Sequence, residues 1–171
     1  MEDIFIREAT VADADVIGRV HVDSWRESYA GIFPDDILRD LSWEERAENW
    51  KKALREEKIP WKMFVAEEGG IVKGFVAVGK SRKPEFPFEG ELYAFYILKE
   101  AQGRGIGRKL FEKVQNSLKL GGMNSMFLLV LKDNGPAIEF YRHMGGKEFS
   151  RIMVNGCGQD FEEIAMAWER I

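Results

Sequence analysis

Residues 91–118 read ELYAFYILKEAQGRGIGRKLFEKVQNSL, and this stretch decides the fold. Its first eight residues, Glu91 to Leu98, are nearly all apolar or aromatic, which is typical of a strand covered on both faces. The segment Gln102-Gly-Arg-Gly-Ile-Gly107 comes next. The helix predicted after it repeats its apolar residues in helical register: Ile106, Leu110, Val114 and Leu118. A strand, a glycine loop and a helix in this order predict a phosphate-binding turn in an α/β fold.

The glycine loop has a physical meaning of its own. Gly103, Gly105 and Gly107 remove side chains where backbone N–H groups must approach a ligand, and the helix start adds its positive dipole end. We therefore expect an anion there, such as a diphosphate, with Arg104 and Arg108 adding charge-assisted hydrogen bonds. The alternative is that the glycines only make a tight turn. The loop lacks the Gly-Lys-Ser/Thr ending of a P-loop, and its glycine spacing differs from the dinucleotide-binding fingerprint.

Outward from this unit, the chain alternates between strand and helix patterns without repeats or low-complexity linkers. Strands are predicted over 3–7, 62–67, 71–78, 126–131, 147–154 and 161–168, the last two joined by a turn at Asn155-Gly156. Helices are predicted from a cap at Thr10 to about Tyr29, over 35–41, from a capping box at Ser42 to before Pro60, from the glycine loop to Gly121, and over 136–144. We expect one α/β domain over residues 1–171.

Composition excludes several function classes. With 25 Lys and Arg against 29 Asp and Glu, the net charge of −4 gives no reason to expect nucleic acid or a membrane as a partner. Cys157 is the only cysteine, so neither an intrachain disulfide nor a multi-cysteine metal site is possible. The two histidines, His21 and His143, form no zinc motif, and we expect no metal. The N-terminus lacks a secretion signal and the longest apolar run, 126–131, is short, so a cytoplasmic location is predicted.

Two motifs resemble those of one enzyme family. Gln102-x-x-Gly105-x-Gly107 is similar to the acetyl-CoA signature of the Gcn5-related N-acetyltransferases (GNAT). Asn134-x-x-Ala137-x-x-Phe140-Tyr141-x-x-x-Gly145 resembles the second motif of that family, and residues 21–35 look like the first helix and loop of many small members. The resemblance covers the whole chain. It implies a mixed, twisted sheet of about seven strands with flanking helices, splayed near the fourth strand.

The resemblance also implies acetyl-CoA as co-substrate and a set of site residues. The residues it assigns to coenzyme A binding are Phe95, Tyr96, Ile97, Gln102, Gly103, Arg104, Gly105, Ile106, Gly107, Arg108, Asn134, Ala137 and Tyr141. Tyr141 falls where a phenol protonates the departing thiolate, and the Ile97 backbone N–H where the thioester oxygen is polarised. Glu91, eleven positions before Gln102, coincides with the catalytic glutamate of the histone-modifying branch and is the candidate base.

The implied reaction is acetyl transfer from acetyl-CoA to an amine. Trp25 and Tyr29 fall where the family's first helix and loop wall the acceptor site. Acidic residues precede the glycine loop and favour a small basic amine such as a polyamine: Glu27, Asp35, Asp36, Glu89 and Glu91. The alternatives are a catalytically inactive coenzyme A-binding module and a protein N-terminal or lysine acetyltransferase. A homodimer is expected because dimers are common among members of the family.

Overall fold

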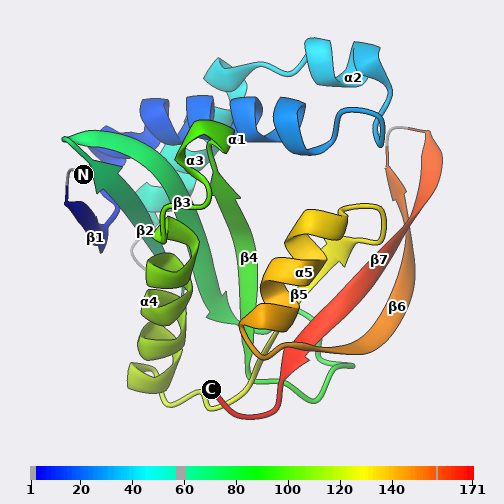
Figure 1. Ribbon diagram of the computed structural model, residues 1–171. Helices are drawn as coiled ribbons and strands as arrows, with labels where there is room; N and C mark the ends of the chain where they lie inside the picture. Colours follow the sequence, from blue (N-terminus) through cyan, green and yellow to red (C-terminus); the bar gives the residue numbers. More distant parts are fainter. Residues whose placement is uncertain (1–2, 57–60, 157) are drawn as a thin grey trace.

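A computed structural model describes residues 3–56, 61–156 and 158–171, and within them seven strands form one mixed sheet (Figure 1). The strands are β1 (Ile4–Glu8), β2 (Trp61–Glu68), β3 (Ile71–Lys80), β4 (Gly90–Ile97), β5 (Met126–Leu131), β6 (Lys147–Gly156) and β7 (Gln159–Trp168). The helices are α1 (Ala14–Ser28), α2 (Asp35–Arg39), α3 (Trp43–Arg55), α4 (Ile106–Leu120) and α5 (Gly135–His143), with 3-10 turns at Val11–Asp13 and Lys99–Ala101. The predicted seven-stranded α/β architecture with flanking helices is confirmed.

The sheet splits between β4 and β5. Its strand order is β1-β2-β3-β4-β5-β7-β6, and every neighbouring pair is antiparallel except β4 with β5. These two parallel strands pair only at Gly90 with Met126 and Glu91 with Phe127. In Figure 1, β4 and β7 lean apart toward α1 and α2 at the top of the view, with α5 between them. The sheet is therefore splayed along the second half of β4, as expected.

The two faces of the sheet carry separate cores. One core joins the sheet to α4 and α5 and includes the buried side chains of Phe111 and Ile138. The other joins it to α1 and α3 and includes Ile17 and Phe75. Helices α1 and α3 approach closely because Gly18 has no side chain: a Cβ there would lie 2.6 Å from the Trp43 carbonyl oxygen.

The last hairpin corrects one prediction. Asn155 and Gly156 do not form its turn, because they still pair with Asp160 and Gln159 and so extend both strands. Cys157 and Pro60 lie outside the described residues. Among the helices that the structure describes, none is both long and apolar enough to cross a membrane.

Candidate functional site

The glycine loop turns the chain from β4 into α4 through left-handed backbone. Gly103 has a φ of 72° and Gly105, which caps α4, a φ of 86°. A Cβ at either position would meet no protein atom within 4 Å, so the loop faces open space. The first turn of α4 carries no acidic residue, which leaves the positive end of a 15-residue helix uncompensated by its own side chains. This arrangement suits an anion.

Gly107 has a different role. A Cβ there would lie 3.1 Å from the Phe140 ring, so this glycine lets α5 pack against the start of α4. Ile106 beside it is fully buried. The glycine loop therefore combines two requirements: open backbone at Gly103 and Gly105, and close helix packing at Gly107.

Two side chains of the loop fasten it to the sheet. The Gln102 Nε2 group donates to the Ile97 carbonyl oxygen at 3.1 Å. The Arg104 guanidinium pairs with the buried Glu68 carboxylate at 2.5 Å. Arg108 is exposed on the first turn of α4. Of the two arginines predicted to meet an anion, Arg104 therefore also has a structural partner on β2.

The second half of β4 has backbone groups on the edge where it no longer pairs with β5. Just after β4, the Leu98 N–H donates to the carbonyl oxygen of Lys73 in β3, at 2.9 Å. Because successive N–H groups of a strand point to opposite edges, the Ile97 N–H points to the edge facing β5. The pairing with β5 stops at Glu91, so this edge can receive a ligand's amide groups. Phe95 stacks on Phe140 on one face, and Tyr96 stacks on His21 on the other, at 5.5 and 4.8 Å between ring centroids.

Tyr141 lies on α5 beside the opening. Its side chain is 7% exposed, and its ring contacts those of Phe95 and Phe140 with centroids 6.1 and 5.4 Å away. Burial, and then the neighbouring Tyr96 phenol, raise the pKa of the Tyr141 hydroxyl. Asn134 caps α5: its Oδ1 accepts from the Ala137 N–H at 3.4 Å, which leaves its amide nitrogen to donate elsewhere.

An aromatic wall connects α1 to β7. The rings of Trp25 and Tyr29 are in contact with each other and with Phe33, with centroids 4.9 to 5.5 Å apart. Phe33 in turn contacts Phe161 of β7 at 4.5 Å. Trp25 and Tyr29, the predicted acceptor residues, are thus brought together with a strand that lies far away in sequence.

Sequence reasoning missed Glu163. This half-buried residue of β7 lies opposite Leu131, near the open end of the splay. Its charge, after burial and the Tyr96 phenol, contributes to raising the pKa of Tyr29, and it also raises that of Tyr96. The available signal was alternation: Glu163 shares the period-two face of the apolar residues Phe161, Ala165 and Ala167.

The acidic residues predicted to face an acceptor have other partners. Glu91 is 4% exposed, and both of its carboxylate oxygens accept from the Arg82 side chain, at 2.7 and 3.2 Å. Glu27 accepts from the Lys99 N–H, and Glu89 from the Asn124 N–H. Asp35 and Asp36 are in the first turn of α2, where they suit the helix dipole. The pairing of Glu91 favours a structural role, and its function as base stays a prediction.

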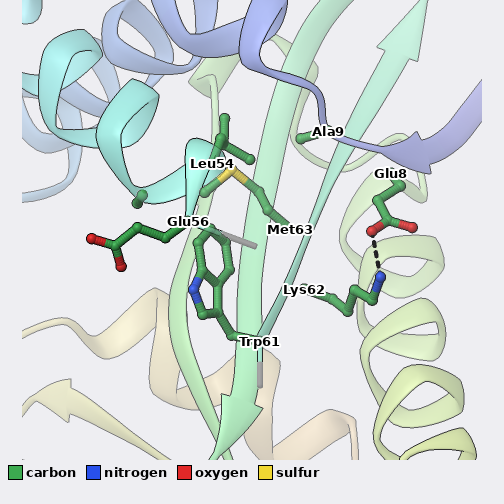
Figure 2. A pocket seen from close by; sticks show the side chains of 8 residues that line it. Glu8, Ala9, Leu54, Glu56, Trp61, Lys62 and Met63 are labelled. Atoms are coloured by element: carbon green, nitrogen blue, oxygen red, sulfur yellow. Dashed lines mark hydrogen bonds and ion pairs between the residues drawn. The ribbon is translucent and has the colours of Figure 1, made fainter. Parts of the chain in front are cut away.

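A cavity of about 220 Å³ lies elsewhere, bounded by the end of α3, the start of β2 and the end of β1 with the residue that follows it. Figure 2 shows Leu54, Trp61 and Met63 around it, and the Glu8–Lys62 ion pair at one side. Its described lining contains no residue of the glycine loop, of β4 or of β5. The described residues also contain no group of three or more His, Cys, Asp or Glu side chains able to hold a metal.

Comparison with known proteins gives a consistent result. The acetyltransferase (GNAT) family profile matches residues 35–145. YuaI, an uncharacterized N-acetyltransferase of Bacillus subtilis, is 36% identical over 96% of this chain and 92% of its own length. A spermidine N(1)-acetyltransferase of Thermoplasma acidophilum is 24% identical over 84% of this chain and 88% of its own. The PaiA N-acetyltransferase of the same organism, crystallised with coenzyme A, has the same fold, with a TM-score of 0.75 at 22% identity over 95% of this chain and 98% of that one.

Proposed function

The chain belongs to the acetyltransferase (GNAT) family and is an N-acetyltransferase, and from this premise we propose that it transfers the acetyl group of acetyl-CoA to a small basic amine such as a polyamine. The proposal rests on two features that lie next to each other in the structure. Left-handed glycines open the start of α4 to an anion, and a buried tyrosine of α5 lies beside the splayed half of β4.

The residues present fit coenzyme A. The amides at the start of α4 suit its pyrophosphate, because Gly103 and Gly105 leave the space in front of them clear. The edge of β4 at Ile97 suits the peptide-like pantetheine arm, and the Asn134 amide nitrogen suits one of its carbonyl groups. When bound, acetyl-CoA supplies an acetyl group activated as a thioester. That PaiA was crystallised with coenzyme A supports this assignment.

The chain's own groups supply the rest of the chemistry. The Ile97 N–H, directed to the open edge of β4, is placed to polarise a carbonyl oxygen. The Tyr141 hydroxyl carries its proton at neutral pH, as tyrosines ordinarily do, and burial raises its pKa further, so the proton is available for a departing thiolate. Both groups are fixed before substrate arrives, one by the sheet and the other by packing.

A small acceptor is favoured over a protein chain by the aromatic wall. The contact of Phe33 with Phe161 joins the segment after α1 to β7, and this leaves less space for an acceptor where β4 and β5 separate. Aromatic faces attract cations, which favours a basic amine. The similarity to a spermidine N(1)-acetyltransferase points the same way.

Several expectations stay predictions. These are a single acetyltransferase domain over 1–171, a cytoplasmic location, a homodimer and the role of Glu91 as base. The Glu91→Gln variant tests the last. A base at this position predicts a rate loss that is greatest at low pH, where deprotonating the amine is hardest, whereas a structural ion pair predicts lower stability with an unchanged pH profile.

An amine panel tests the proposed function. Thiol release from acetyl-CoA is followed with spermidine, a neutral amino acid amide and a peptide with a free N-terminus, and each product is weighed by mass spectrometry. We expect the highest kcat/KM for spermidine. A better peptide or neutral substrate contradicts the acceptor class, and binding of acetyl-CoA without thiol release from any amine would favour an inactive module.

A further inference from the structure

Glu163 differs from the other inward-facing carboxylates of the protein. In the described part of the chain, the buried acids each have an arginine within hydrogen-bond distance: Asp13 pairs with Arg7, Glu68 with Arg104 and Glu91 with Arg82, at 2.5 to 2.7 Å. Over the same residues, no ion pair within 4.0 Å involves Glu163, although it is half-buried. Burying a carboxylate is unfavourable unless a cation or hydrogen-bond donors compensate it.

The alternation of side chains along β7 places Glu163 on the face that carries Phe161, where the acceptor is proposed to bind. Its neighbour Glu162 faces the other way and forms exposed ion pairs with Lys132 and Arg151, at 2.7 and 3.4 Å. Because side chains alternate along a strand, Glu163 lies on the opposite face, with Phe161 two residues before it. Phe161 is the residue that contacts the aromatic wall.

The groups around Glu163 come from separate elements. Tyr29 follows α1 and Tyr96 is on β4, and the Glu163 charge acts on the phenols of both. Lys83, from the segment between β3 and β4, is the cation whose charge reaches it, but burial outweighs that charge and raises the pKa of the Glu163 carboxyl. The site thus combines a carboxylate short of a partner, two phenols and a set of aromatic rings, which is the chemistry that recognises an alkylammonium ion.

The same group of residues reaches the proposed reaction centre. Burial, and then the Tyr96 phenol, raises the pKa of Tyr141, while burial followed by the Tyr96 and Tyr141 phenols raises that of Tyr29. Phe161, on the same face of β7 as Glu163, contacts Phe33 of the aromatic wall, so Glu163 lies on the side where the acceptor is proposed to approach Tyr141, the proposed acid. A carboxylate stabilises the charged form of an amine, which suits a nitrogen that stays protonated better than the one that must become neutral to attack.

We propose that Glu163 binds a second, non-reacting ammonium group of the acceptor and so makes the enzyme selective for diamines and polyamines over monoamines. This inference rests on the proposed function, since it names the group that recognises the acceptor of that reaction. The aromatic wall covers the alkyl chain, and Glu163 receives the ammonium group at its end.

The first test compares putrescine with butylamine, which has the same carbon chain and one ammonium group fewer. In Glu163→Gln, kcat/KM for putrescine should fall about 10- to 100-fold through KM, as expected for losing a charged hydrogen bond, while butylamine changes less than about twofold. Glu162→Gln is the matched control, because it makes the same change on the other face of β7, and it should leave both substrates unaffected. An equal loss for both amines, or no loss, would overturn the assignment.

Two further measurements separate this inference from the proposed function. Calorimetry of putrescine binding to the coenzyme A complex needs no turnover, so tighter binding to wild type than to Glu163→Gln supports the inference even if no acetylation occurs. Equal binding, or no binding to either protein, overturns it. The melting temperature of Glu163→Gln should not fall, since no internal ion pair is lost, and a clear fall would indicate a structural role instead.

Discussion

Burial gives Tyr141 and His21 opposite consequences at the scale of single residues. For Tyr141, burial raises the pKa of a hydroxyl that already carries its proton at neutral pH and can donate it. For His21, burial removes the proton: its side chain is 8% exposed, and desolvation, followed by the charge of Arg46, lowers its pKa to about 4. Its neutral Nδ1 accepts from the Trp50 Nε1–H at 3.0 Å, and its ring supports Tyr96.

The Tyr141→Phe variant tests the role of the hydroxyl. It keeps the ring that packs on Phe95 and Phe140, so the fold and coenzyme A affinity should be unchanged. Turnover should fall by about 10- to 10³-fold, the usual contribution of a general acid. Steady-state kinetics together with calorimetry measure both quantities, and full turnover in the variant would assign the hydroxyl a structural role.

His21 predicts a pH dependence of stability. Its ordinary pKa is 6.5 and its folded-state pKa is about 4, so between these values the unfolded chain binds the proton more readily. The free energy of unfolding should therefore fall as the pH drops from 6.5 to 4, by about 2–3 kcal/mol from this residue. Urea unfolding of wild type and His21→Phe at several pH values measures this. Parallel pH curves for the two proteins would show that His21 is not responsible.

The site residues were not equally predictable from sequence. Tyr141 and the glycines belong to motifs with a fixed local spacing, so the sequence alone was enough to identify them as candidate site residues. Glu91 also has the right spacing, but sequence does not show that Arg82 folds back onto it. Glu163 carries no motif at all. Its environment is created by α1, β4 and β7 together, which is a tertiary property.

At the scale of elements, the loop before α4 shows why one glycine of the signature differs from the next. Gly105 needs left-handed backbone and clear space, whereas Gly107 needs only room for a neighbouring ring. Secondary structure was predictable because apolar periodicity and capping residues are local signals. The turn expected at Asn155-Gly156 was wrong because pairing between β6 and β7 continues past it, and cross-strand pairing outweighs a turn signal.

Gly105→Val separates the backbone requirement from the ligand requirement. A branched side chain at a φ of 86° costs about 1–3 kcal/mol of stability and projects into the space proposed for the pyrophosphate. Gly70→Val is the matched control: Gly70 has a φ of 75° in the β2–β3 turn and equally open surroundings. Both variants should lose similar stability, and only Gly105→Val should lose coenzyme A affinity. Comparable affinity in the two folded variants would contradict the proposed phosphate site.

At the scale of the whole molecule, the site exists because the sheet fails to close between β4 and β5. Helix α4 contributes its N-terminus to the region where β4 and β5 separate, and α5 contributes Tyr141. The segment after α1 contacts β7 through Phe33 and Phe161. Each of these contributions comes from a different part of the chain (Figure 1). The fold class was predictable from element order, but the identity of the groups that meet across the opening required the structure.

A crystal structure of the protein with coenzyme A tests the central claim most directly. We predict pyrophosphate oxygens within hydrogen-bond distance of the amides between Gly103 and Arg108, the pantetheine arm along the open edge of β4, and the thiol beside the Tyr141 hydroxyl. Coenzyme A bound away from the glycine loop, or with its thiol directed away from Tyr141, would contradict the account.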